Sequence, residues 1–296
     1  MIRLVRRLTI AALPALSVLP ALSHASGDLT DGADDDTSLH VAPAGTRVVR
    51  DVAYGADPAQ RFDVYLPATP AAAAAPAPVI FFVHGGGWAR GDKAMTRVVE
   101  PKVGHWVGQG YVVISTDYRM LPTPVDRQAD DVASAIAFAQ SRATSWNGDP
   151  ARFILVGHSA GAHLVALLSA GAPTAAAPRP WRGAVLLDSA ALDVPAIMAQ
   201  RHFRLYDRAF GADPRPWTAV SPIAQLRGPT PPMLAVCSSR RRESCGQADR
   251  FAAKANGLGG QVRVLREDLS HLQINATLGA ASDYTAQVDA FMQSLR

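Results

Sequence analysis

Cysteine is scarce in this sequence: among its 296 residues only Cys237 and Cys245 are cysteine. Zinc and similar metal ions are held in proteins by several grouped cysteine, histidine or carboxylate side chains. No cysteine-histidine ligand set of that kind occurs along the chain. We therefore expect no metal site.

A long apolar run and a basic stripe are also missing. After residue 25, no stretch approaches the roughly 18 consecutive apolar residues of a membrane-spanning helix. The formal net charge is +4, but it is not gathered into a stripe of basic residues interleaved with aromatic ones, the pattern typical of nucleic-acid-binding proteins. Both absences argue against stable membrane insertion and against a nucleic-acid partner.

Residues 1–25 have the three-part order of a secretory signal peptide. They run from the basic MIRLVRR through the apolar LTIAALPALSVLPAL to small residues, which predicts cleavage after Ala25. Removal of its three arginines would lower the formal charge from +4 to +1. We expect a soluble protein that is secreted or periplasmic, with an acidic, flexible leader over residues 26–45.

The predicted export bears on the state of the two cysteines. In an oxidising compartment, a single pair of cysteines predicts a disulfide between Cys237 and Cys245. The alternative is two unrelated buried thiols. A disulfide would enclose the short segment SSRRRES.

Strand-like and helical patterns alternate through the rest of the chain. The strand-like runs are RVVRDVAY, RFDVYLP, VIFFV, YVVISTDY, RFILV, GAVLLD, PMLAVCS and QVRVLR, and the helical patterns include ADDVASAIAFAQ, AGAHLVALLSA, GQADRFAAKANG and YTAQVDAFMQSL. Continuous apolar strands alternating with helices indicate an α/β fold with a mostly parallel central sheet covered by helices on both faces. We expect one such domain over residues 46–296, with a small flap after the sixth strand.

The pentapeptide GHSAG occupies residues 157–161, between the apolar RFILV and a helical pattern. A serine at a sharp strand-to-helix turn stands above the sheet edge, beside the N-H groups and partial positive charge of the helix start. Such a turn crowds the backbone, so Gly157 and Gly161 are needed where a β-carbon would collide. A plain glycine-rich turn is the alternative, but the flanking strand and helix favour Ser159 as a nucleophile.

A second glycine motif, HGGGW at residues 84–88, directly follows the buried run VIFFV. Successive glycines let a loop fold close to a ligand and aim N-H groups at it, as an oxyanion hole requires. The loop also falls at the carboxyl end of a strand, where α/β sheets carry their sites. We predict an oxyanion hole made by Gly86, Gly87 and Ala160.

Together, HGGGW, DYRM at 117–120 and GDPARFILVGHSAGAHL at 148–164 resemble the serine esterases of the α/β-hydrolase fold. Similar enzymes are hormone-sensitive-lipase-like and carboxylesterase-like, and include bacterial feruloyl or acetyl esterases and kynurenine formamidases. The resemblance implies a Ser-His-acid triad and hydrolysis of carboxylic esters through an acyl-enzyme intermediate. The motifs mark the superfamily and do not identify a substrate.

The resemblance also orders the triad as nucleophile, acid and histidine. Three histidines follow Ser159 in the chain. His163 falls one turn into the helix behind the serine and His202 in an irregular segment, whereas His271 falls where the last strand ends, as in the family. This implies His271 as the catalytic histidine.

The acid is less well marked. Family members usually carry an aspartate in a loop after the strand corresponding to PMLAVCS, but here that loop reads CSSRRRESCGQAD. Its one enclosed acid, Glu243, has a separation from His271 similar to that in the family, and three preceding arginines would keep it ionised. We expect Glu243 as the triad acid, with Asp188, one strand earlier, as the alternative.

These residues predict a serine hydrolase that needs neither a metal nor an organic cofactor and whose partner is a small-molecule ester. Residues 189–231 suffice only for a small flap, which favours an open pocket and short-chain or aromatic esters. Two alternatives remain: a serine amidase or peptidase with the same triad, and a non-catalytic binding protein that retains the fold. A lost acid would be the signature of the second. The sequence indicates no oligomeric state.

Overall fold

The computed structural model describes residues 42–68 and 75–295. The predicted signal peptide and most of the predicted acidic leader therefore lie outside the described residues. No helix in these ranges has the length and apolar character needed to cross a membrane.

The centre of the molecule is one eight-stranded sheet in the order β1-β2-β4-β3-β5-β6-β7-β8. The strands are β1 (Thr46–Ala53), β2 (Arg61–Pro67), β3 (Ala77–Val83), β4 (Val112–Thr116), β5 (Gly148–His158), β6 (Gly183–Leu187), β7 (Met233–Ser238) and β8 (Val262–Glu267). β2 runs antiparallel to β1 and β4, and all later pairs are parallel. The predicted mostly parallel sheet is confirmed, with each strand-like run forming a strand.

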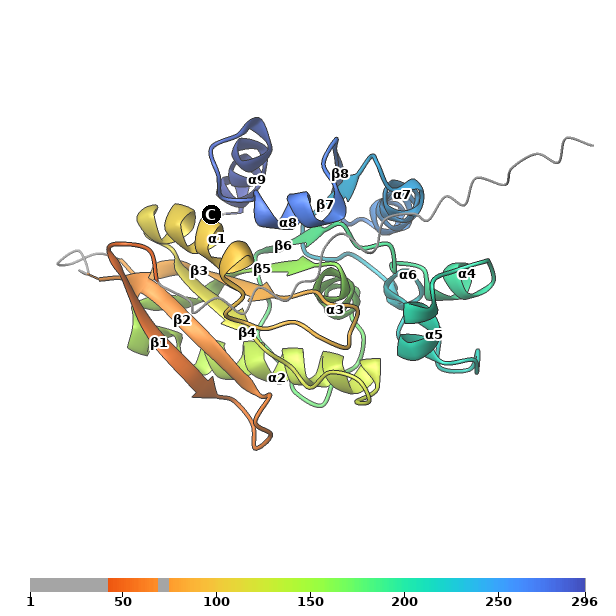
Figure 1. The fold of residues 1–296 in the computed structure, drawn as a ribbon, viewed down its shortest axis with the longest axis horizontal. Coiled ribbons are helices and arrows are strands. Elements are labelled where there is room, and N and C mark those ends of the chain that lie inside the picture. Colours follow the sequence, from red (N-terminus) through yellow and green to blue (C-terminus); the bar gives the residue numbers. More distant parts are fainter. Residues whose placement is uncertain (1–41, 69–74, 296) are drawn as a thin grey trace, which may run out of the picture.

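Helices cover both faces of this sheet (Figure 1). The first face carries α2 (Val125–Arg142), α3 (Ala160–Ser169) and α7 (Arg242–Gly257), and the second carries α1 (Thr96–Gly108), α8 (His271–Ala276) and α9 (Asp283–Ser294). Side chains of β3 alternate between the faces: Phe81 packs in the first core cluster, and Ile80 and Phe82 pack in the second. Burial on both faces explains why the strands are continuously apolar.

The predicted small flap lies between β6 and β7. It contains three short helices, α4 (Val194–Met198), α5 (Arg204–Phe210) and α6 (Pro222–Gln225). Phe210 of the flap packs edge-on against Trp88 of the HGGGW motif, with ring centroids 4.9 Å apart. The flap therefore borders the carboxyl end of β3, the edge at which both glycine motifs were expected.

Candidate active site

Ser159 lies at the turn between β5 and α3, as predicted. Its φ of 54° is a left-handed conformation that a non-glycine residue rarely adopts. A β-carbon at Gly157 would lie 2.4 Å from the carbonyl oxygen of Gly161, and one at Gly161 would lie 2.2 Å from that of Val83. The two glycines therefore allow the backbone contacts that hold the serine in this strained turn.

His271 is the histidine that reaches the serine. It is the first residue of α8, whose start is fixed by a capping box between Ser270 and Gln273. His271 Nε2 lies 3.0 Å from Ser159 Oγ, within hydrogen-bonding distance. His163, by contrast, is buried inside the first core cluster, where Nε2 donates to the Val220 carbonyl at 2.7 Å.

The carboxylate against this histidine belongs to Asp188, which directly follows β6. Its Oδ2 lies 2.6 Å from His271 Nδ1. Its Oδ1 accepts from the backbone N-H of Ser238 at 2.7 Å and from the hydroxyl of Ser244. The side chain is 0 % exposed, so these donors are what hold a negative charge in the interior.

Glu243, the acid favoured from the sequence, is exposed in the first turn of α7. The geometry favours the alternative, Asp188, because β6 ends at the catalytic edge, whereas Glu243 begins a helix whose buried side faces the core. The preceding arginines do not serve Glu243 either: Arg240 binds Asp268 at 2.8 Å and Arg241 binds Asp188. The expectation for the acid is corrected to Asp188.

Arg241 is the residue of this site that the sequence did not reveal. Its Nη1 lies 2.5 Å from Asp188 Oδ2 and donates to the Asp188 carbonyl at 3.0 Å. Because His271 Nδ1 and Arg241 Nη1 meet the same carboxylate oxygen, the two nitrogens lie only 2.8 Å apart. A run of three arginines is ordinarily a solvated loop, so no local signal distinguished the middle one.

Charge around Asp188 favours its ionised form. Burial alone would raise the pKa of this carboxyl. The hydrogen bond from His271 and the positive charge of Arg241 outweigh that effect and hold the pKa well below its usual range. Asp188 is therefore a carboxylate at neutral pH.

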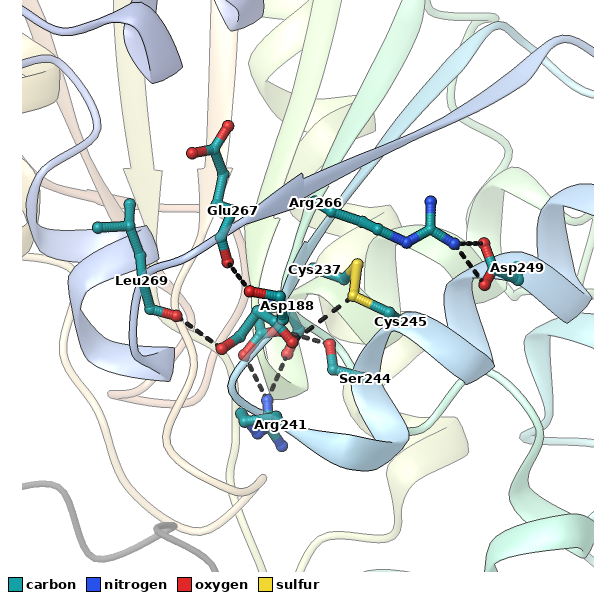
Figure 2. Close-up of a disulfide and its surroundings, with 11 residues drawn as sticks. Asp188, Cys237, Arg241, Ser244, Cys245, Asp249, Arg266, Glu267 and Leu269 are labelled. Carbon is teal, nitrogen blue, oxygen red and sulfur yellow. Dashed lines mark hydrogen bonds and ion pairs between the residues drawn. A yellow bond between two sulfur atoms is a disulfide. The ribbon is translucent and has the colours of Figure 1, made fainter.

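The disulfide between Cys237 and Cys245 is present, with Cα atoms 5.1 Å apart. It joins the end of β7 to the first turn of α7 and closes the loop that carries Arg241 (Figure 2). Figure 2 shows Arg241 and Ser244 converging on Asp188 from this loop. The cross-link thus encloses the donors to the carboxylate.

The HGGGW loop lies beside Ser159, as expected of an oxyanion hole. Gly86 and Gly87 have φ of +110° and +61° and line the pocket above the serine, while Ala160 begins α3 directly after it. A β-carbon at Gly86 would lie 2.0 Å from the carbonyl oxygen of Arg90. Within the described residues, no acceptor is bound to the N-H groups of Gly86, Gly87 or Ala160, so these donors are available.

The DYRM segment packs against the HGGGW loop and forms hydrogen bonds with it. The Tyr118 ring stacks on His84 with centroids 4.6 Å apart, and its hydroxyl donates to the His84 carbonyl at 3.1 Å. Further along, the N-H of Leu121 donates to the Trp88 carbonyl at 2.8 Å. Both ends of HGGGW are therefore tied to the segment after β4.

Two other histidines beside the nucleophile are held neutral by burial. His158 stacks on His271 at 4.5 Å, with its Nε2 3.1 Å from the His271 carbonyl. Burial, reinforced by the neighbouring His271, lowers the pKa of His158 well below its usual value. Burial likewise lowers the pKa of His163 to about 4, which leaves its Nδ1 as acceptor for Trp88 Nε1 at 3.3 Å.

A cavity of about 310 Å³ opens above Ser159 and His271. Trp88 and Tyr206 line it, together with Leu205 and Leu272, and Ser189 and the arginines add polar groups. Phe203 and Trp217 of the flap do not line it, and Phe203 is 46 % exposed.

Comparison with known proteins finds similarity to esterases. Residues 62–177 match the family model BD-FAE. The chain is 35 % identical over 121 residues to a probable isoprenylcysteine alpha-carbonyl methylesterase of Oryza sativa subsp. japonica, a match covering 40 % of this chain and 28 % of that one. It is 31 % identical over 211 residues to the esterase LipC of Mycobacterium tuberculosis, covering 64 % and 50 %. The chain thus spans half or less of the length of these relatives.

Solved structures extend the similarity over most of the chain. Esterase B from Lactobacillus rhamnosis superposes with a TM-score of 0.71 at 18 % identity, covering 86 % of this chain and 87 % of that one. Apo Thermogutta terrifontis esterase 2 superposes with a TM-score of 0.68 at 23 % identity, covering 85 % and 95 %. The chain therefore has the α/β-hydrolase fold that was predicted, the fold of these bacterial esterases, with a BD-FAE match across the segment that carries both glycine motifs.

Proposed function

We propose that this protein is a serine hydrolase of carboxylic esters in which Ser159 is the nucleophile, His271 the general base and Asp188 the triad acid. One observation carries the proposal: Ser159 Oγ, His271 and Asp188 form a continuous chain of contacts of 3.0 and 2.6 Å. These contacts begin at a strained strand-to-helix turn, beside a glycine loop whose Gly86 and Gly87 N-H groups have no acceptor among the described residues. Triads are recognised by such geometry and roles.

Acylation follows from the positions of these atoms. Ser159 Oγ attacks the ester carbonyl carbon while its proton passes to His271 Nε2. The displaced electron pair of the carbonyl goes to oxygen, where the N-H groups of Gly86, Gly87 and Ala160 would stabilise the negative charge. The bond to the alcohol oxygen then breaks, and that oxygen takes the proton from Nε2.

Deacylation repeats these steps with water. A water oxygen attacks the acyl carbon and gives its proton to Nε2, and the collapse of the second tetrahedral intermediate returns that proton to Ser159 Oγ as the carboxylic acid leaves. Throughout, Asp188 accepts from His271 Nδ1, which keeps the lone pair of the imidazole on Nε2. Its lowered pKa supports this role, because a protonated carboxyl would not stabilise the imidazolium.

The size of the cavity favours short-chain or aromatic esters. A volume of about 310 Å³ lies at the lower end of small-molecule sites. The methylesterase and esterase activities named for the relatives fit the same reaction class. We also propose export, as the basic-apolar-small order of residues 1–25 and the Cys237–Cys245 disulfide support it.

A panel of p-nitrophenyl esters from acetate to palmitate tests the proposal. The purified protein should hydrolyse the short members, and Ser159→Ala should lower kcat by about 10⁶-fold if the serine mechanism holds. Circular dichroism of both proteins establishes that the variant is folded. Activity of Ser159→Ala within tenfold of the parent would rule the nucleophile out, and inactivity of the parent on every ester would reject the function.

A further inference from the structure

The charged side chains that line the catalytic cavity are all of one sign. Arg90, Arg208 and Arg241 reach it from three different segments: the oxyanion loop, helix α5 of the flap and the disulfide loop. No aspartate or glutamate is among the lining residues of the described chain. Arg241 contacts Asp188 whatever the substrate, but Arg90 and Arg208 add like charges that repel one another around one small space.

Only one nitrogen of the Arg241 guanidinium forms hydrogen bonds with the described residues. Its Nη1 carries all of its contacts, with Asp188 and His271. Nε and Nη2 have no partner within residues 42–68 and 75–295, although the side chain is only 15 % exposed. Since Arg241 lines the cavity, these two nitrogens form an unused face of a guanidinium, which is the geometry that binds a carboxylate through two parallel hydrogen bonds.

Arg90 and Arg208 are not neutralised by the described part of the protein either. Both side chains are exposed, and no described carboxylate lies within 4.0 Å of either guanidinium. The acid next to Arg208 in sequence, Asp207, pairs instead with His202 at 2.9 Å. The positive charge of these two arginines is therefore free to act on whatever enters the cavity.

The negative charge of Asp188 does not cancel this field. Asp188 is fully buried and shares its oxygens among His271, Arg241, Ser238 and Ser244. Among the described lysines and arginines it is ion-paired with Arg241 alone, so Arg90 and Arg208 keep their charge at the cavity. A cleft with low-dielectric walls concentrates such a field on its contents.

We propose that the preferred substrates are esters carrying an anionic group, most simply a carboxylate, on the part that occupies this cavity. The inference rests on the proposed function, because it names the substrate class of that same site. Arg241 would bind the anion through Nε and Nη2, with Arg90 and Arg208 attracting it from the rim. These three arginines are thereby specificity-determining residues.

Matched pairs of esters that differ in one charge provide the test. Para-acetoxybenzoate and para-acetoxybenzamide carry the difference on the alcohol side, and monomethyl succinate and methyl succinamate carry it on the acyl side. A carboxamide has nearly the shape of a carboxylate without its charge. Each kcat/KM is divided by the rate of hydroxide hydrolysis of the same ester, which removes intrinsic reactivity. We expect the anionic member of at least one pair to be favoured roughly tenfold, and less so at high salt.

Variants of Arg90 and Arg208 test whether these two arginines cause the preference for anionic esters. Arg90→Gln combined with Arg208→Gln should reduce the ratio of anionic to neutral kcat/KM severalfold, and the two lysine substitutions should retain most of it. The matched control is Arg204→Gln, which removes the same charge from the same helix, α5, at an exposed residue that does not line the cavity. The control should leave the ratio unchanged.

The outcomes distinguish failure of the proposed substrate class from failure of the proposed esterase function. Hydrolysis of both members of each pair at equal normalised rates, or faster hydrolysis of the neutral members, overturns the substrate class and leaves the esterase function standing. An anionic preference that survives the double glutamine variant, or falls equally in Arg204→Gln, overturns its assignment to these arginines. Failure to hydrolyse any of the four esters and phenyl acetate as well rejects the proposed function itself.

Discussion

The turn after β5 and the loop after β7 meet at the same site but are held by different physical means. The turn after β5 is fixed by close packing of the backbone, because Gly157 and Gly161 leave no room for a side chain. The loop after β7 has a disulfide at its ends and an arginine ion-paired to a buried carboxylate. The steric contacts join Gly157 to Gly161 within the turn and Gly161 to Val83 of the neighbouring strand, whereas the ion pair joins two loops through charged side chains 53 residues apart, Arg241 and Asp188.

This difference predicts how each region responds to substitution. A β-carbon placed against a carbonyl oxygen displaces the backbone, and no neighbouring group can compensate. Asp188 has several donors, so the loss of one of them leaves the others in place. Loss of the Asp188 carboxylate instead leaves the largely buried Arg241 without its ion-pair partner. The predictions below run from the largest expected effect to the smallest.

The sharpest comparison is between the two candidate acids. Asp188→Asn should lower kcat by about 10⁴-fold, because the amide no longer fixes the catalytic tautomer of His271. Glu243→Gln, the matched control in the same region, should remain close to the parent, since that side chain is exposed at the start of α7. Steady-state kinetics on p-nitrophenyl acetate measures both. A fully active Asp188→Asn with an inactive Glu243→Gln would restore Glu243 as the acid.

Next in size is the oxyanion loop. Gly86→Ala should lower turnover by about 10²- to 10³-fold, since its β-carbon would lie 2.0 Å from the Arg90 carbonyl and displace an N-H donor. Gly108→Ala is the control: no atom lies within 4 Å of a β-carbon there, on the exposed end of α1. Parental turnover in Gly86→Ala would mean that the loop is only structural.

The disulfide should matter more for stability than for turnover. Replacing Cys237 and Cys245 together with alanine should lower the free energy of unfolding by about 2–3 kcal/mol, because the open loop regains conformational entropy in the unfolded chain. Turnover should also fall, though less than in Gly86→Ala, as the loop presents Arg241 and Ser244 to Asp188. Urea unfolding measures the first effect. Titration of two free thiols in unreduced, unfolded parent would remove the cross-link from this account.

The smallest effect per unit of change concerns pH and His163, which lies in α3 directly after the turn at Ser159. The folded-state pKa of His163 is about 4, below the unfolded value of about 6.5. Between these values the unfolded chain binds a proton that the folded protein excludes, so stability falls as the pH is lowered from 6.5 toward 4, by about 1 kcal/mol per pH unit for this group. The lowered pKa of Asp188 makes stability fall only below about pH 3.8. His163 and Asp188 therefore reduce stability in different pH ranges.

His163→Gln isolates that window. Its amide can still donate to the Val220 carbonyl and accept from Trp88, but it has no proton to gain. The difference in unfolding free energy between parent and variant should therefore shrink toward acid pH, measured by urea titration at several pH values. A difference independent of pH from 7 to 4 would assign the acid sensitivity to other groups, His158 among them.

The comparison also explains which parts of the molecule could be predicted from sequence. The strands, the turn at Ser159 and the HGGGW loop could be predicted because each is marked by a short sequence pattern, an apolar run or a glycine motif, even where the contacts it allows are long-range. Helix α1 was not predicted because it contains Pro101 and charged residues that break its apolar periodicity. The short helices of the flap are too brief to show any period.

The triad acid could not be fixed from sequence for a different reason. Asp188 and Glu243 both follow strands whose carboxyl ends reach the catalytic edge, and which carboxylate faces His271 depends on how β6, β7 and β8 pair. The role of Arg241 could not be predicted either, because nothing in three successive arginines indicates that one of them is ion-paired to a buried aspartate. Long-range electrostatics of this kind requires the tertiary structure.

The spread of the proposed triad along the chain bears on when during folding its three residues can meet. Ser159 and His271 are 112 residues apart, and Asp188 and His271 are 83 apart. Parallel strand pairing over such distances closes long loops before any contact is gained, which makes this kind of sheet slow to fold. Because His271 follows β8, a nascent chain that ends before residue 271 lacks one member of the proposed triad. During refolding, ester hydrolysis should therefore recover only after collapse and helix formation, as the last signal to appear.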